Sequence, residues 1–171
     1  RSGAEHGGWC PEHALTPGLD GPRCGRCAGA LPSGLAGGET CSACRRRSPG
    51  FQTVVAPFSY RRDAVRAAVL AFKHGGRADL AVPLARAMAL GLGDGASRPG
   101  PGPFDLLVPV PSHLGRRLER GHDPARRLTE ALEVCGVGLS TPVLTRTRAT
   151  APQGSAGAPG RRKNVRGAFR A

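Results

Sequence analysis

Four cysteines form two C-x-x-C pairs, "CGRC" at residues 24–27 and "CSAC" at residues 41–44, separated by thirteen residues. Each pair places two thiolates at one turn of the chain, and Gly25 relaxes the first turn. Two such pairs at this separation are typical of a structural zinc site, where four sulfur ligands surround one tetrahedral ion. The sequence therefore predicts a zinc-ribbon module over residues 1–46, with a poorly ordered N-terminal segment, in which Zn²⁺ is bound by Cys24, Cys27, Cys41 and Cys44.

Two other uses of cysteine are less favoured by this pattern. Disulfides are typical of secreted proteins, and no signal peptide is visible. A dithiol redox motif needs only one C-x-x-C pair and a βαβ context. Cys10 and His13 have the spacing of half a second metal site but lack a partner pair, so we expect them to be a remnant. Cys135 lies in a helical pattern and is predicted to be a small core residue.

The chain is strongly basic, with a formal net charge of +13 from 23 Arg and 2 Lys against 12 acidic residues. Two explanations stay open: a coding bias towards Arg, and attraction to the phosphates of a nucleotide or a nucleic acid. No apolar run approaches the roughly 20 residues needed to cross a membrane. We therefore expect no membrane segment and a cytoplasmic protein.

A hydrophobic core is expected in the middle of the chain, because residues 51–144 hold 27 of its 33 Leu, Val and Phe residues. Apolar residues at helical spacing predict helices over 63–74, 79–92 and 123–135. The last of these has Asp123 as N-cap and Pro124 at its first position.

Strands are predicted between these helices. The segments "FQTVVAPFSY" (51–60) and "TPVLTRTR" (141–148) have strand composition, and "FDLLVPVP" (104–111) is typical of a central strand buried on both faces. Residues 112–122 and 149–164 are predicted to be loops, the second long and flexible. Alternating strands and helices predict an α/β domain with a largely parallel sheet over residues 51–171.

A ligand site is expected where "VPVP" ends, because open parallel sheets bind ligands beyond the carboxyl ends of their strands. A basic segment follows there, and the N-terminus of helix 123–135 lies at the same edge. Guanidinium groups, backbone N–H groups and the helix dipole would converge on an anion such as a pyrophosphate. A solvated basic loop is the alternative. The residues concerned are Arg116, Arg117, Arg120 and Gly121.

Several motifs in order resemble those of ComF-type competence proteins: the cysteine pairs, "VRAAVLAFKHGG", "LLVPVP", "RRLERG", "TRTRATAPQ" and "RRKNVRGAF". The resemblance runs from about residue 22 to residue 171. It implies a zinc ribbon followed by a type I phosphoribosyltransferase-like domain, and a link to DNA uptake. It also implies phosphoribosyl pyrophosphate or another polyanion as ligand, with Mg²⁺ in the full-length protein. A second interpretation is a non-catalytic module that binds single-stranded DNA or a helicase-like competence protein.

The same resemblance assigns roles to individual residues. The pyrophosphate loop falls on residues 112–121, and so includes Ser112 together with the basic residues above. The flexible loop that closes over such active sites falls on a segment with Thr150, Gln153, Arg161 and Asn164.

Two departures from the family pattern bear on function. The family usually reads R-G-F-N-Q where this chain has "RGHDP" (120–124), and the Asp123 carboxylate would repel a phosphate. The chain also ends shortly after "VRGAF", the start of an expected strand, before the loop that binds the ribose 5-phosphate. It begins at Arg1, and Met88 is its only methionine. We therefore expect a fragment without transferase activity, whose segment 147–166 is the least ordered part of the body.

Overall fold

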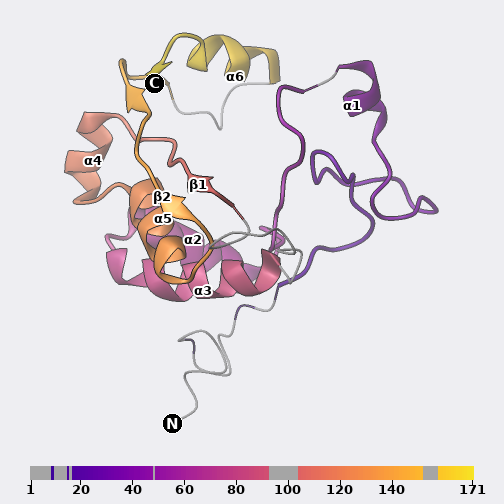
Figure 1. Ribbon diagram of the computed structural model, residues 1–171, viewed down its shortest axis with the longest axis horizontal. Coiled ribbons are helices and arrows are strands. Elements are labelled where there is room, and N and C mark those ends of the chain that lie inside the picture. Colours follow the sequence, from indigo (N-terminus) through magenta and orange to yellow (C-terminus); the bar gives the residue numbers. More distant parts are fainter. Residues whose placement is uncertain (1–8, 10–14, 16, 48, 93–103, 152–157) are drawn as a thin grey trace. The chain divides into compact units, whose positions relative to one another are not determined.

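The computed structural model describes residues 9, 15, 17–47, 49–92, 104–151 and 158–171 (Figure 1). The chain divides into two compact units, one of residues 1–67 with 87–95 and one of residues 68–86 with 96–171. Each unit is described by itself below. The assignment of domains to residues 1–46 and 51–171 stays a prediction. No helix in the described part of the chain is both long and apolar enough to cross a membrane.

The first unit contains the cysteine pairs. A tight hairpin around the first pair is closed by an antiparallel bridge between Arg23 and Ala30. The second pair begins the short helix α1, Ser42–Arg46, in which Cys44 lies.

The strand predicted over residues 51–60 is wrong. The segment is extended but makes one parallel bridge, between Phe58 and Gly18. Its apolar residues Phe51, Val54 and Val55 are exposed. A strand needs a partner along its length to satisfy its N–H and C=O groups, and within the described residues this segment has only that bridge.

The two predicted helices that follow are confirmed. Helix α2 spans Asp63–His74, and the predicted inner-face residues Val65, Ala68 and Phe72 are buried. A 3-10 turn, η2 at Ala78–Leu80, leads into helix α3 at Ala81–Leu92. The spacing of apolar residues was sufficient here, because a helix satisfies its own backbone groups.

The second unit contains a small parallel sheet. Strand β1 (Leu106–Leu107) pairs with β2 (Leu139–Ser140). Along the chain, helix α4 (Leu114–Arg120) and helix α5 (Pro124–Val134) connect β1 to β2 (Figure 1). Asp123 caps α5 as predicted, since its side chain accepts a hydrogen bond from the Ala125 N–H.

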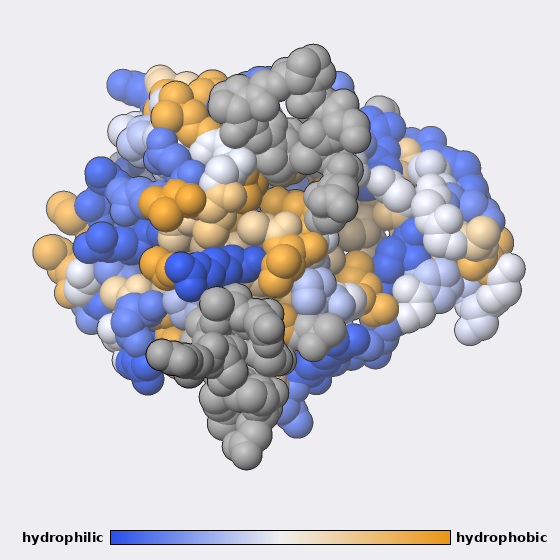
Figure 2. All heavy atoms as spheres, turned by 60° about the horizontal axis from the view of Figure 1, so that its bottom comes forward, coloured by the Kyte–Doolittle hydropathy of each residue, from blue (hydrophilic) through white to orange (hydrophobic). Residues whose placement is uncertain are grey.

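Burial of segment 104–111 on both faces is wrong. Leu106 is 55% exposed and Val110 is 59% exposed, whereas Pro109 is buried, so only alternate residues face inward. Among the described residues β1 has one neighbour, β2. Pro109 and Pro111 have no N–H to donate, which shortens the paired part. Figure 2 shows one face of the molecule, on which hydrophobic residues (orange) are exposed among hydrophilic ones (blue).

The sheet is not largely parallel. Strand β3 (Thr145–Arg146) pairs antiparallel with β4 (Phe169–Arg170), in a second two-stranded sheet. The start of a strand expected at "VRGAF" is thus confirmed as β4. Two predicted loops contain helical residues: α4 lies within 112–122, and α6 (Ala158–Val165) begins within 149–164 and ends one residue after it. The described residues therefore form a mixed helix-and-strand structure in place of one parallel sheet.

Candidate metal centre and anion-binding groove

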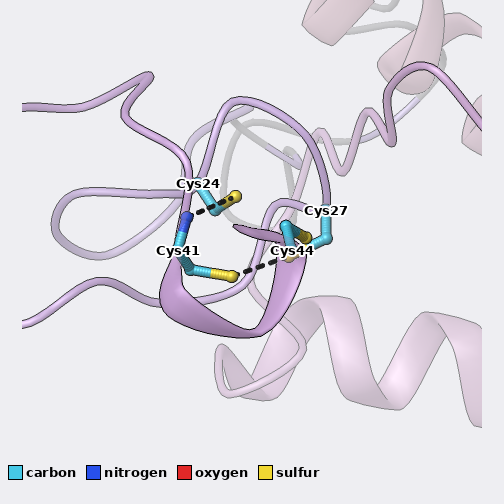
Figure 3. A group of neighbouring side chains, drawn as sticks. All are labelled: Cys24, Cys27, Cys41 and Cys44. Carbon is cyan, nitrogen blue, oxygen red and sulfur yellow. Dashed lines mark hydrogen bonds between the residues drawn. The ribbon is translucent and has the colours of Figure 1, made fainter. Parts of the chain in front are cut away.

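The four predicted cysteine ligands lie together, with all of their Sγ atoms within 4.8 Å of one another (Figure 3). The Sγ atoms of Cys27 and Cys41 are 3.8 Å apart. Tetrahedral coordination with Zn–S bonds of about 2.3 Å places sulfurs about 3.8 Å apart. The donor set and its spacing therefore fit a metal ion of this kind, and none of these cysteines is in a disulfide.

Backbone hydrogen bonds favour a thiolate at the first ligand. The Cys41 and Arg26 N–H groups donate to Cys24 Sγ at 3.3 and 3.4 Å. Backbone hydrogen bonds from Cys41, Cys27 and Arg26, in decreasing order of effect, lower the pKa of Cys24 to about 6. Burial raises the pKa of Cys44 to about 12. A metal ion would have to displace the proton of the Cys44 thiol, because only the thiolate is a ligand.

The cysteine cluster has almost no apolar core of its own. Cys24, Leu31 and Cys44 are its buried members, and Cys27 and Cys41 pack against them. The turn is also tight: a Cβ atom on Gly25 would lie 2.4 Å from the Gly38 carbonyl oxygen. A metal ion bound by the four cysteines would therefore supply the stability that side-chain packing supplies elsewhere.

The segment after the second cysteine pair is hydrogen-bonded to the turn that contains the first pair, residues 24–27. The Arg26 guanidinium donates to the carbonyl oxygens of Pro49 and Phe51 at 3.1 and 3.3 Å. The Val54 N–H donates to the Arg26 carbonyl at 2.8 Å, and the Thr53 hydroxyl donates to the Gly25 carbonyl at 3.0 Å. Residues 49–54 therefore form a strap over the turn 24–27.

Two other cysteine predictions have different outcomes. Cys10 and His13 lie outside the described residues. Cys135 follows α5 as its C-cap and is half-buried, with a free thiol.

A groove opens at the carboxyl ends of the two parallel strands. One cavity of about 200 Å³ is lined by Pro109 and Pro111 after β1, by Pro142 and Leu144 after β2, and by Arg117 and Arg126. A second cavity of about 290 Å³ shares Arg117, Asp123 and Arg126 with the first. The groove therefore lies where parallel sheets bind ligands, at the N-terminus of α5.

The Asp123 side chain is buried and lines both cavities of this groove. Its carboxylate accepts hydrogen bonds from the Ser112 N–H at 3.1 Å and the Ala125 N–H at 3.2 Å. It also pairs with the Arg117 guanidinium at 3.9 Å. A backbone amide, a helix N-terminus and an arginine are the donors that would otherwise bind an anion.

The remaining residues of the predicted pyrophosphate loop do not all point to one place. Arg116 donates to the Thr150 carbonyl at 3.0 Å, whereas its neighbour Arg117 faces Asp123. The Arg120 carbonyl bonds Nδ1 of buried His122, whose ring packs on Phe72 at 5.4 Å. Gly121, at φ 76°, ends α4 and lines the larger cavity.

Of the predicted flexible-loop residues, Gln153 lies outside the described residues. Arg161 is exposed on α6. The Asn164 side-chain amide donates to the Ala151 carbonyl at 2.8 Å, and Thr150 is buried. The expectation that segment 147–166 is the least ordered stays a prediction.

Sequence reasoning missed Arg146 and Arg148 as candidate site residues. Arg146 donates to the Thr150 hydroxyl, and Arg148 donates to the carbonyl oxygens of Asn164 and Arg166. The signal was present in "TRTR", because residues two apart on the predicted strand 141–148 would share one face, although β3 itself ends at Arg146.

Comparison with protein-family models, curated proteins and solved structures finds no match to this chain.

Proposed function

We propose that this chain is a ComF-type, phosphoribosyltransferase-like protein of the cytoplasm with a structural zinc ion, acting in DNA uptake. Its groove would bind the pyrophosphate end of phosphoribosyl pyrophosphate or a similar polyanion. The observation that carries the proposal is the groove itself. It lies at the carboxyl ends of β1 and β2, beside the N-terminus of α5, and Arg117 and Arg126 line it.

The position of Asp123 supports weak binding without catalysis. Its carboxylate already takes the Ser112 and Ala125 N–H groups and faces Arg117. An incoming phosphate would compete with it for these donors and be repelled by its charge.

Calorimetry with phosphoribosyl pyrophosphate and Mg²⁺ tests this function. We expect weak binding by the unmodified chain, displaced by inorganic pyrophosphate, and no phosphoribosyl transfer. Asp123→Asn keeps the cap and removes the charge, so affinity should rise about tenfold. Arg117→Gln should weaken binding, and Arg86→Gln, an exposed arginine on α3, should not. Tight binding that requires the ribose would contradict the proposal.

A second candidate is a non-catalytic module that binds single-stranded DNA beside a helicase-like partner. The observation that favours it is the basic run Arg45, Arg46 and Arg47, exposed on and just after α1 in the cysteine module. Fluorescence anisotropy with a labelled oligonucleotide at increasing salt tests it. Steep salt dependence, reduced in an Arg46→Gln and Arg47→Gln double variant, would favour this function over the first.

A further inference from the structure

Three arginines of the second unit lie close together in the chain or in space, and two of them donate to the buried residue Thr150. Arg146, on β3, donates to the Thr150 hydroxyl and to the Pro111 carbonyl, the latter at 3.5 Å. Arg116, on α4, donates to the Thr150 carbonyl at 3.0 Å. Arg148 lies two residues after Arg146, and its carbonyl accepts from Arg146 Nε at 3.4 Å. The Arg148 guanidinium donates to the carbonyl oxygens of Arg166 and Asn164 at 2.7 and 3.1 Å. The Arg146 guanidinium also lies over the Phe169 ring, 5.3 Å from its centroid.

The positive charge of this arginine cluster (Arg116, Arg146 and Arg148) is not balanced by acid. Within the described residues no carboxylate forms an ion pair with any of the three, whereas Arg117 and Arg126 have Asp123 and Glu130. The hydrogen-bond acceptors recorded for the cluster are neutral: the carbonyl oxygens of Pro111, Arg148, Thr150, Asn164 and Arg166, and the Thr150 hydroxyl.

Both burial and mutual repulsion act on the cluster. Burial lowers the pKa of Arg146, and the charges of Arg116 and Arg148 lower it further. A cation held half-buried beside two like charges costs free energy, and an anion of opposite charge would offset that cost.

Donors remain available for such an anion. A guanidinium group has five N–H donors. The recorded bonds of Arg116 and Arg148 both use Nη2, so Nε and Nη1 of each can donate to a ligand. Guanidinium groups form paired hydrogen bonds with the oxygens of a phosphate.

We propose that Arg116, Arg146 and Arg148 form a binding site for a compact phosphate dianion, separate from the groove at Asp123. The neighbours Arg116 and Arg117 belong to different sites, since one contacts Thr150 and the other contacts Asp123. Arg116 and Arg146 converge on one buried residue, and the charge of Arg148 acts on Arg146. This arrangement favours a small dianion over an extended nucleic acid backbone. This site goes beyond the proposed function, which concerns the groove, and its existence does not depend on ligand binding in the groove.

Titration of the 171-residue chain with inorganic phosphate, and then pyrophosphate, without Mg²⁺, tests the site. Calorimetry should show one saturable phosphate site. In ¹H–¹⁵N spectra the Nε–H signals of the three arginines, assigned from single variants, should shift together. Arg148→Gln should weaken phosphate binding on the order of tenfold to a hundredfold, because it removes charge-assisted hydrogen bonds. Arg146→Lys keeps the charge but loses the paired donors of the planar guanidinium group, so it should weaken phosphate binding less than Arg148→Gln does.

Matched controls separate this site from other causes. Arg86→Gln removes one positive charge from an exposed position on α3 and should leave phosphate binding unchanged. Arg117→Gln should also leave it unchanged, although it weakens phosphoribosyl pyrophosphate binding in the groove. Absence of saturable phosphate binding would overturn the inference. Equal losses in Arg86→Gln and Arg148→Gln, or binding of oligonucleotides but not of phosphate, would overturn it too.

Discussion

The cysteine module and the two small sheets of the second unit reach order in different ways. In the module, four ligands from two turns meet within 4.8 Å, and Leu31 is the only buried residue of the cluster that is not a cysteine. In the described part of the second unit, each two-residue strand pairs with one other strand. Several apolar residues of this unit are exposed. A metal site concentrates its stabilising energy in a few covalent-like bonds, whereas a sheet spreads it over partners distant in sequence.

Removing the metal should have the largest effect on stability, and that effect should be confined to the cysteine module. Chelation, or Cys44→Ser, should unfold residues 22–46, because zinc binding contributes on the order of 10 kcal/mol to such modules. Hydrogen exchange should show lost protection there and unchanged protection around β1 and β2. Cys135→Ser, outside the cluster, is the control and should retain one zinc per chain. Persistent protection of residues 22–46 without metal would break the comparison.

Truncating a core residue of the second unit should have an intermediate effect. Leu132 on α5 is 6% exposed, so Leu132→Ala should lower the free energy of unfolding by about 2–5 kcal/mol through lost burial and a cavity. Val134→Ala on the same helix changes a residue that is 85% exposed and should be nearly neutral. Urea unfolding followed by circular dichroism measures both. Zinc content should stay the same in each variant, and loss of zinc from Leu132→Ala would show that the two regions are coupled.

A change within the first cysteine turn should have a smaller effect that sharpens the comparison. Gly25→Ala places a Cβ 2.4 Å from the Gly38 carbonyl oxygen, a backbone atom that cannot move away alone. We expect a cost of about 1–3 kcal/mol, seen as weaker zinc binding in competition with a chelating dye. Gly37→Ala is the control, since its Cβ would meet nothing within 4 Å. Equal zinc affinity in the two variants would show that the turn tolerates the side chain.

Local patterns in the sequence predicted local structure well. The cysteine cluster followed from spacing alone, and helices α2, α3 and α5 followed from apolar periodicity. Each of these features depends on residues within a few turns of one another. The capping role of Asp123 was also predicted, because it depends only on the next two residues.

Features that depend on distant partners were predicted poorly. Segment 51–60 has strand composition, yet within the described residues it makes one β-bridge, to Gly18, and its other bonds are isolated contacts with the turn at Gly25 and Arg26. Helix α4 was taken for a loop, because "SHLGRRLERGH" has a glycine and no clear apolar face, and its cap is the His113 side chain accepting from the Gly115 N–H. At the candidate site, the divergence of Arg116 and Arg117 depends on Thr150 and Asp123, which no spacing rule connects.

The strap over the first cysteine turn has a mechanical consequence. Residues 49–54 are held by Arg26, Gly25 and their carbonyls, and these lie in the turn that the metal ligands shape. If metal loss frees the strap, residues 49–54 become part of the unattached connecting chain. The maximum span of that chain then grows by up to about 20 Å, at about 3.4 Å per extended residue. A longer tether lowers the effective concentration of one binding region near another. A bound zinc ion would then limit how far the cysteine module can move from the second unit. Chelation should therefore weaken the binding of one polyanion to both regions at once, even where each region alone binds it unchanged.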